Sequence, residues 1–298
     1  MRSCSKTSAE LRRARPLLGT FVEIRASAPT AAEAERAVGA AFAAVDRVQT
    51  LMSFHDPLSD VSRLNRRAGR SVCVHAWTHF VLRRAQELHA ATAGLFDIAT
   101  APALVRGGWL PGDAAAVAAT GTAADITLLA GHRVRFRRPL LIDLGGIAKG
   151  FAVDRAVAAL RRHGATAGTV NAGGDLRIFG SAREPVHVRR PESPGEFQLL
   201  TTLQNSALAT SAPYYAARLI GGRPRAPVID PRHDRPSRQL FSVTVQARTG
   251  LLADALCKVV WLAGADAAAP LLRRYRATAW VIKTHRFVPR PNPSRHAA

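Results

Sequence analysis

A lysine close behind two glycines is the strongest chemical signal in the chain. Lys149 lies in the stretch LLIDLGGIAKGFAVDRAV at residues 140–157, although only four of the 42 lysine and arginine residues are lysines. Glycines let the backbone approach a ligand closely, and the free N–H groups of a helix N-terminus attract anions. Asp143, at the expected end of a strand, faces the same site. The stretch predicts a phosphate site, because lysine supplies a compact charge; a glycine turn with a solvated lysine is the alternative.

Two further motifs carry charged residues that could join this site. TGLLADALCKVV places Asp254 and Lys258 at positions i and i+4 of one helical face. Spacing alone favours a surface ion pair, whereas the alternative is that Asp254 offers a hard oxygen ligand to Mg²⁺. NAGGD at 171–175 is a second glycine turn, which carries Asp175 and is typical of a hairpin.

Other kinds of active site find no support in the sequence. No Ser/His/Asp triad, pair of catalytic carboxylates or thiolate centre can be assigned from spacing. The three cysteines are scattered, without a metal-binding pattern. The net charge of +21 leaves a nucleic-acid-binding protein as an alternative. Arginine is spread along the whole chain, however, and no arginine run is interleaved with aromatic residues as a stacking platform requires.

The elements that must position these residues do not alternate strictly between strand and helix, which predicts an α+β fold: one domain with a mixed or antiparallel sheet and packed helices. Thr30 and Glu33 fit a capping box for a helix over 29–53. Helices are expected at 77–94, 149–163, 249–264 and 270–277, and strands at 20–27, 125–130, 132–137, 140–146, 166–170, 176–180, 185–190, 197–203, 241–247 and 278–285. Residues 1–16 are predicted to be a flexible segment, 17–288 the domain and 289–298 a loose tail.

The start of the chain lacks the apolar core of a secretory signal. We therefore expect a cytoplasmic protein without a transmembrane helix, and a different start codon would allow a periplasmic one.

Several segments, taken in order, resemble the ApbE family, the FAD:protein FMN transferases. They are LGTFVEI, LMSFHDPLSDVSRLN, GLFDIATAP, IDLGGIAKGFAVDRAV, VNAGGDLRIFG, ALATSA, VIDPR and SVTVQARTGLLADAL, which together cover residues 18 to 264. The resemblance implies an α+β fold and a Mg²⁺-dependent enzyme that splits FAD at its pyrophosphate. FMN would pass to a threonine or serine hydroxyl of a flavoprotein in an electron-transfer chain, within an S/T-G-A-S/T motif, and AMP would be released.

The resemblance also assigns site residues by position. The FAD contacts fall on Leu18, His55, Leu95, Phe96, Asp97, Asp143, Lys149 and Val228. The metal ligands fall on the backbone carbonyl of Gly146 and the carboxylate of Asp254. Lys149, Asp254 and His233 are the implied catalytic residues.

Two positions depart from the family pattern. Cys257 and Lys258 stand where members often carry a hydroxyl metal ligand, and Lys258 either binds phosphate in place of a second metal or pairs with Asp254. Pro227 replaces a histidine that often precedes the IIDP element, for which His233 is the candidate substitute. These departures leave a degenerate FAD-binding protein, or an FAD pyrophosphate hydrolase without a protein acceptor, as the alternative function.

Overall fold

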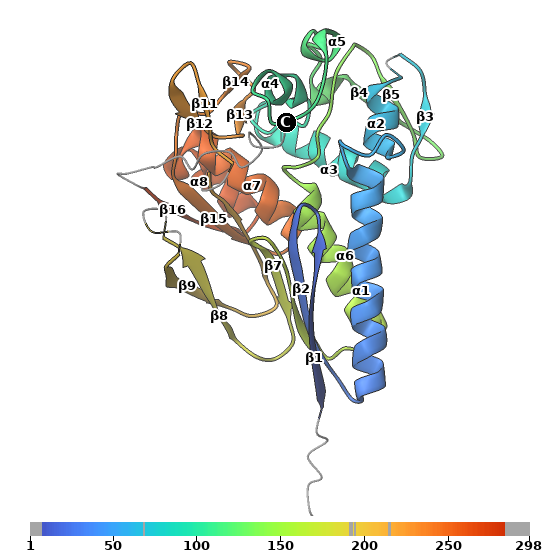
Figure 1. Cartoon of the computed structure of the whole chain (residues 1–298), viewed down its shortest axis with the longest axis vertical. Coiled ribbons are helices and arrows are strands. Elements are labelled where there is room, and N and C mark those ends of the chain that lie inside the picture. Colours follow the sequence, from blue (N-terminus) through green and yellow to red (C-terminus); the bar gives the residue numbers. More distant parts are fainter. Residues whose placement is uncertain (1–7, 68, 191–192, 194, 214–215, 284–298) are drawn as a thin grey trace, which may run out of the picture.

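A seven-stranded antiparallel sheet forms the centre of the fold (Figure 1). The structure is a computed structural model that describes residues 8–67, 69–190, 193, 195–213 and 216–283. The strands follow in the spatial order β1 (Ala9–Leu17), β2 (Thr20–Ala28), β6 (Ala167–Ala172), β7 (Asp175–Phe179), β10 (Ala207–Ser211), β15 (Ser242–Ala247) and β16 (Thr278–Ile282). Every neighbouring pair runs antiparallel. The α+β class expected from the sequence is confirmed.

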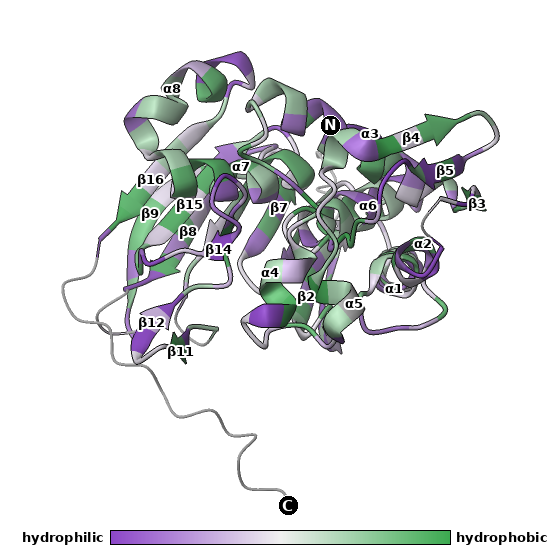
Figure 2. Ribbon diagram, turned by 90° about the horizontal axis from the view of Figure 1, so that it is seen from above, coloured by the Kyte–Doolittle hydropathy of each residue, from purple (hydrophilic) through white to green (hydrophobic). Residues whose placement is uncertain are grey.

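Helices cover one face of this sheet, and a hairpin covers part of the other (Figure 1). The helices are α1 (Ala31–Met52), α6 (Ala148–Arg162) and α7 (Gly250–Ala263), with α8 (Ala265–Arg274) behind α7. The hairpin is β8 (Glu184–Arg189) with β9 (Phe197–Leu203), which pack on the outward-facing side chains of β7 and β10. In Figure 2 α7 is largely green, as expected of a helix that is buried on most sides.

Local sequence signals explain where the long helices begin. The Glu33 N–H donates a 3.2 Å hydrogen bond to Oγ1 of Thr30, which confirms Thr30 as the N-cap of α1. The predicted apolar face of α6 is confirmed too, because Val153, Val157 and Leu160 are at most 1% exposed.

The remaining elements gather at one end of the sheet, at the top of Figure 1. They include α2 (Asp60–Asn65), α3 (Ala76–Ala91), α4 (Ala101–Arg106), α5 (Ala114–Val117) and the short 3₁₀ helix at Ala123–Asp125. A small sheet joins β3 (Val72–Cys73), β5 (Arg133–Phe136) and β4 (Ile126–Leu129), and two small hairpins pair β11 (Arg218–Ile220) with β12 (Arg223–Arg225) and β13 (Ile229–Asp230) with β14 (Arg235–Pro236). Within the described ranges, no helix is both long and apolar enough to cross a membrane.

Two glycines let α6 and α7 cross at very short range. A Cβ added to Gly150 would lie 2.1 Å from the carbonyl oxygen of Gly250, and one added to Gly250 would lie 2.4 Å from that of Gly150. Asp154 secures the crossing from α6, since its carboxylate accepts the N–H groups of Gly250 at 2.8 Å and Leu251 at 3.0 Å. Burial raises the pKa of Asp154, and Arg177 partly offsets that rise by pairing with the same carboxylate. The crossing therefore places Lys149 of α6 near Asp254 and Lys258 of α7.

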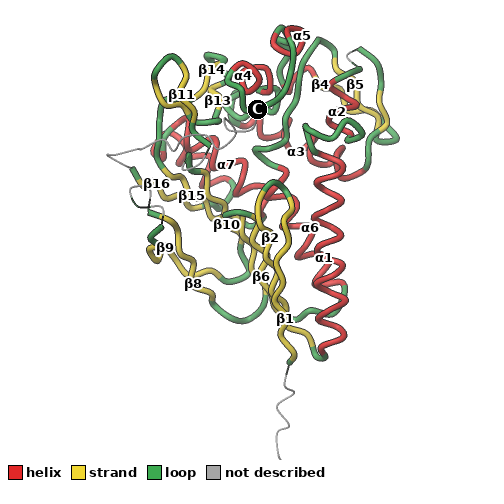
Figure 3. The backbone as a smooth tube through the Cα atoms, viewed as in Figure 1, coloured by secondary structure: helices red, strands yellow, loops and turns green. Residues whose placement is uncertain are grey.

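Two expectations about local structure were wrong. Residues 140–146 form no strand but run as the irregular segment before α6, drawn green in Figure 3. The side chain of Asn65 replaces a strand partner there: it donates to the carbonyl oxygen of Ile142 and accepts from its N–H, both at 2.9 Å. Residues 9–16, predicted to be flexible, belong to β1, whose backbone pairs with β2 and whose Arg12 lies 2.6 Å from Glu23. Residues 1–7 and the predicted tail at 289–298 lie outside the described residues.

Candidate active site

Two cavities meet at the turn before α6. One, of about 430 Å³, lies among the segment after α3, the end of β10, the segment before β13 and the side chains of α7. The other, of about 510 Å³, lies beside the turn between β1 and β2 and the end of α1. Leu110, Asp143, Gly145 and Lys149 line both cavities. A ligand with two bulky ends could therefore occupy both, with its middle at these four residues.

The glycine turn at this junction is held by hydrogen bonds of its backbone N–H groups. The N–H of Gly145 donates to Oδ2 of Asp143 at 3.1 Å, while the backbone N–H of Asp143 donates to the carbonyl of Ile98 at 2.8 Å and fixes the turn. Burial raises the pKa of Asp143, and the Gly145 hydrogen bond offsets part of that rise. Ile147, the N-cap residue of α6, offers no side-chain acceptor, and the free N–H of Gly150 in the first turn is accepted by the Asp254 carboxylate from α7 at 3.1 Å. A helix start of this kind favours an anion.

Lys149 extends from the first turn of α6 and pairs with an aspartate from the hairpin of the central sheet. Its Nζ lies 2.7 Å from Oδ2 of Asp175, a residue whose side chain is only 2% exposed. Burial lowers the pKa of Lys149, but the carboxylates of Asp175 and Asp254 outweigh burial and raise it, so the ammonium stays charged. Burial and the nearby Asp254 raise the pKa of Asp175 to about 6, against the opposing effect of Lys149.

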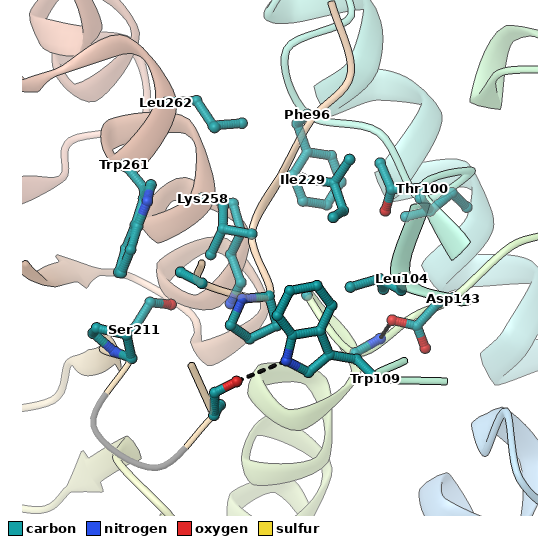
Figure 4. A pocket seen from close by; sticks show the side chains of 18 of the residues that line it. Phe96, Thr100, Leu104, Trp109, Asp143, Ser211, Ile229, Lys258, Trp261 and Leu262 are labelled. Atoms are coloured by element: carbon teal, nitrogen blue, oxygen red, sulfur yellow. Dashed lines mark hydrogen bonds between the residues drawn. The ribbon is translucent and has the colours of Figure 1, made fainter. Parts of the chain in front are cut away.

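Asp254 and Lys258 form a second buried ion pair, one turn apart on α7. Oδ1 of Asp254 pairs with Nζ of Lys258, and Oδ2 accepts the N–H of Gly150 at 3.1 Å. Burial would raise the pKa of Asp254, but the two lysine ammonium groups outweigh burial and lower it. The ion-pair prediction is therefore confirmed, although the pair is buried rather than at the surface. Figure 4 shows Lys258 extending from α7 into the first cavity.

Cys257 points away from this site. Its thiol donates to the carbonyl oxygen of Ala209 at 3.2 Å, and it packs in the apolar cluster between α7 and β15. Burial raises the pKa of the Cys257 thiol to about 12, so it offers no thiolate at neutral pH.

All eight predicted FAD contacts line one cavity or both. Leu18 and His55 line the second cavity, where the His55 ring stands edge-on to Phe54 with centroids 6.2 Å apart. Leu95, Phe96, Asp97 and Val228 line the first, as does Gly146. Asp97 also orders its own loop, because its Oδ1 accepts the N–H groups of Ala99 at 2.8 Å and Ala123 at 3.1 Å.

His233 is not brought to the cavities with the other predicted residues. Its imidazole is 52% exposed, and its Nδ1 lies 3.1 Å from Oδ2 of Asp230 in the turn between β13 and β14. It is absent from the described lining of both cavities. Its role as a catalytic residue stays a prediction.

Sequence reasoning did not assign three residues that shape the site. Asp175 holds Lys149, Asp154 fixes the start of α7, and the Trp109 indole N–H donates to the carbonyl of Ala216 at 2.7 Å across the first cavity (Figure 4). The GGD end of the second glycine turn was the available signal for Asp175. No spacing rule connects Asp154 or Trp109 with partners about 100 residues away.

Known proteins share both this sequence pattern and this fold. The chain is 31% identical over 216 residues to an FAD:protein FMN transferase of Rhodobacter capsulatus, covering 67% of this chain and 41% of that protein. It is 30% identical to one of Haemophilus influenzae over 47% of this chain and 43% of that protein. The matches thus span about two-fifths of the length of these two relatives.

The structural comparisons cover almost the whole fold. The flavinyl transferase ApbE of Pseudomonas stutzeri, in its apo form, superposes with a TM-score of 0.79 at 21% identity, over 94% of this chain and 92% of that one. The ApbE protein of Thermotoga maritima gives a TM-score of 0.78 at 25% identity, over 94% and 97%. The ApbE family model matches residues 18–282. A match of that extent, on a chain with this fold and these paired charges, shows that the protein belongs to the ApbE family.

Proposed function

We propose that this protein is an FAD:protein FMN transferase. The observation that carries the proposal is the pair of cavities that meet at Lys149. FAD has two ring systems joined by a pyrophosphate, so each ring system would occupy one cavity and the pyrophosphate would lie at the cationic junction. Family membership and the activity named for the relatives support the same assignment.

The residues around the cavities suit the two ends of FAD. In the second cavity, the ring of His55 offers a face on which the flavin ring system would stack, as aromatic rings do at offset distances. In the first, the side chains of Leu95, Phe96 and Val228 offer apolar contacts to the adenine. The turn at Gly145 lets the backbone approach the phosphates.

The proposed reaction transfers a phosphoryl group. A threonine or serine hydroxyl oxygen of the acceptor attacks the phosphorus of the FMN half, the bond from this phosphorus to the bridging oxygen breaks, and AMP leaves with that oxygen. The hydroxyl proton is released. Such transfers depend mainly on positioning and charge neutralisation, which Lys149 would supply. The base that removes the proton is predicted to be His233, which would have to reach the acceptor from outside the cavities.

A magnesium ion at Gly146 and Asp254 stays a prediction from the family resemblance. The donor set found here does not fit it. One oxygen of Asp254 is paired with the Lys258 ammonium and the other accepts the Gly150 N–H. A hard cation needs free oxygen ligands, and an ammonium beside them repels it.

The proposal is tested by incubating the protein with FAD, with and without Mg²⁺, and a small domain carrying an S/T-G-A-S/T motif. We propose a flavoprotein of an electron-transfer chain as the natural acceptor. In-gel flavin fluorescence should show a covalent product, and AMP should appear in equal amount. Lys149→Met serves as the matched inactive variant. If a known family enzyme labels the domain in parallel and this protein does not, the transferase assignment fails.

A second candidate is an FAD pyrophosphate hydrolase. Pro227, which offers no proton-accepting group, lines the first cavity, whereas the exposed His233 does not. Water could then replace the acceptor hydroxyl. Stoichiometric FMN and AMP without labelled protein would select this candidate.

A further inference from the structure

Lys258 occupies the space between the two residues that the family resemblance implies as metal ligands. Its Nζ donates to the backbone oxygen of Asp254 at 3.1 Å and pairs with Oδ1 of the same residue. Its aliphatic stem passes over Gly146, since a Cβ added to that glycine would lie 3.5 Å from Cε of Lys258. The side chain is thus held from both sides.

Asp254 fixes the position of the Lys258 ammonium but leaves one of its N–H donors for a ligand. The Asp254 side chain is fully buried, whereas the Lys258 side chain is 21% exposed and lines the first cavity. An ammonium has three N–H donors. Two of them point to the Asp254 oxygens, so the third remains for an oxygen of a ligand in the cavity.

Lys258 and Lys149 face the same cavity from two different helices. Each is tied to its own buried carboxylate, Asp254 and Asp175 respectively. The carboxylates pair with both ammonium groups and limit the rotamers of the two lysines. A phosphate pair between the two ammonium groups would therefore meet two fixed positive charges, which is the arrangement that stabilises charge developing on a leaving phosphate.

We infer that the Lys258 ammonium replaces a divalent cation, so that this protein binds and cleaves FAD without metal. The inference rests on the proposed function. In the step, the oxygen of the acceptor hydroxyl, or of water, forms a bond to the phosphorus of the FMN half. The bond from this phosphorus to the bridging oxygen breaks, AMP departs with the electron pair, and the attacking group loses its proton to a base or to solvent. Lys258 neutralises the negative charge that grows on the departing phosphate.

Two variants of the full chain test whether the Lys258 ammonium or a bound metal ion neutralises the charge of the phosphates. Lys258→Met removes the charge but keeps the stem, and Lys258→Thr supplies a hydroxyl where an ammonium stood. Lys283→Thr is the matched control, because Lys283 is exposed and lies outside both cavities. Each protein is treated with EDTA, desalted, and measured with and without Mg²⁺. FAD affinity is followed by flavin fluorescence, which needs no turnover, and AMP release is followed with the acceptor domain present.

The unaltered protein and Lys283→Thr should bind and cleave FAD equally well with and without Mg²⁺. Lys258→Met should release AMP about 100- to 1,000-fold more slowly, as when one charge-stabilising donor is removed, and Mg²⁺ should not restore it. Lys258→Thr should lose activity after EDTA and regain it with Mg²⁺.

Four results would overturn the inference. If the unaltered protein needs Mg²⁺ to bind or cleave FAD, or if Lys258→Met behaves like the unaltered protein, the inference fails while the proposed function stands. If Lys283→Thr is impaired as strongly as Lys258→Met, the slower AMP release results from the lower net charge of the protein and not from the loss of Lys258. FAD that is neither bound nor cleaved under any condition defeats the inference and the proposed function together.

Discussion

Replacing Lys149 by methionine should make the stability of the protein depend strongly on pH. The methionine keeps most of the apolar stem but removes the ammonium, which lies 2.7 Å from Asp175. Asp175 is 2% exposed there, so its carboxylate loses its partner without gaining water. Removing one member of a buried ion pair costs about 3–5 kcal/mol when the other stays charged.

The sign of the pH effect follows from the pKa of Asp175. In the unaltered protein this pKa is raised from 3.8 to about 6. The folded state therefore binds more protons than the unfolded state between these two values, and the free energy of unfolding falls as pH rises through that window. Without Lys149 the pKa of Asp175 rises further and the window extends upward. Lys149→Met should thus lose little stability at pH 5, where Asp175 is protonated, and about 3–5 kcal/mol at pH 8.

Urea unfolding followed by tryptophan fluorescence at pH 5 and pH 8 measures this difference. The double variant Lys149→Met with Asp175→Asn is the control. It should lose less than about 2 kcal/mol at either pH, because no buried charge remains unpaired, yet it should not cleave FAD. An equal loss for Lys149→Met at both pH values would refute the reasoning, since an effect of packing alone does not depend on the protonation of Asp175.

Three other substitutions, with Gly39→Ala as a control, test the crossing of the helices, the second cavity and the predicted general base. Gly150→Ala should lower the free energy of unfolding by about 3 kcal/mol through its clash with Gly250, whereas Gly39→Ala, with open space around it, should raise it by about 0.5–1 kcal/mol; calorimetry compares the two. His55→Ala should weaken FAD binding by about 1 kcal/mol, the value of one aromatic stack, in a flavin fluorescence titration, and an unchanged affinity would remove His55 from the flavin site. His233→Ala should slow transfer about 100-fold at unchanged FAD affinity if it is the general base; an unchanged rate would exclude that role.

Local sequence patterns were sufficient for the long helices and for the hairpin of β6 and β7, but not for the short helices α4 and α5. The cap at Thr30, the buried face of α6 and the turn at 171–175 each depend on residues within a few positions of one another, so they can be recognised without knowing the fold. The segment 140–144 was misassigned because its partner is the side chain of Asn65, which no strand pattern reveals.

Strand β1 was missed for a related reason. Its sequence is rich in arginine and mostly exposed, so it carries no alternating apolar signal. Its order comes from backbone pairing with β2 and from contacts such as that between Arg12 and Glu23. Composition describes side chains, whereas an edge strand is held mainly by its backbone.

In the site, too, some residues were recognisable from the sequence and others only from the fold. The glycine turn indicated Lys149 and the family resemblance assigned Asp254 to the site, but the partners of these residues could not all be found from the sequence. The pairing of Lys149 with Asp175 and the hold of Asp154 on α7 exist only after three segments, far apart in sequence, have converged. Lys258 could be assigned to either of two roles from sequence, and both of its contacts with Asp254 became visible only in the fold.

The crossing of α6 and α7 also determines when the site can form during synthesis of the chain. The hydrogen bond from Gly150 to Asp254 links residues 104 positions apart. When the ribosome has released the glycine turn and Lys149, α7 with Asp254 and Lys258 has not yet emerged. A chain ending before residue 250 would carry the glycine turn without the buried carboxylate of Asp254. The paired charges at the junction of the two cavities are therefore complete only after α7 has been made.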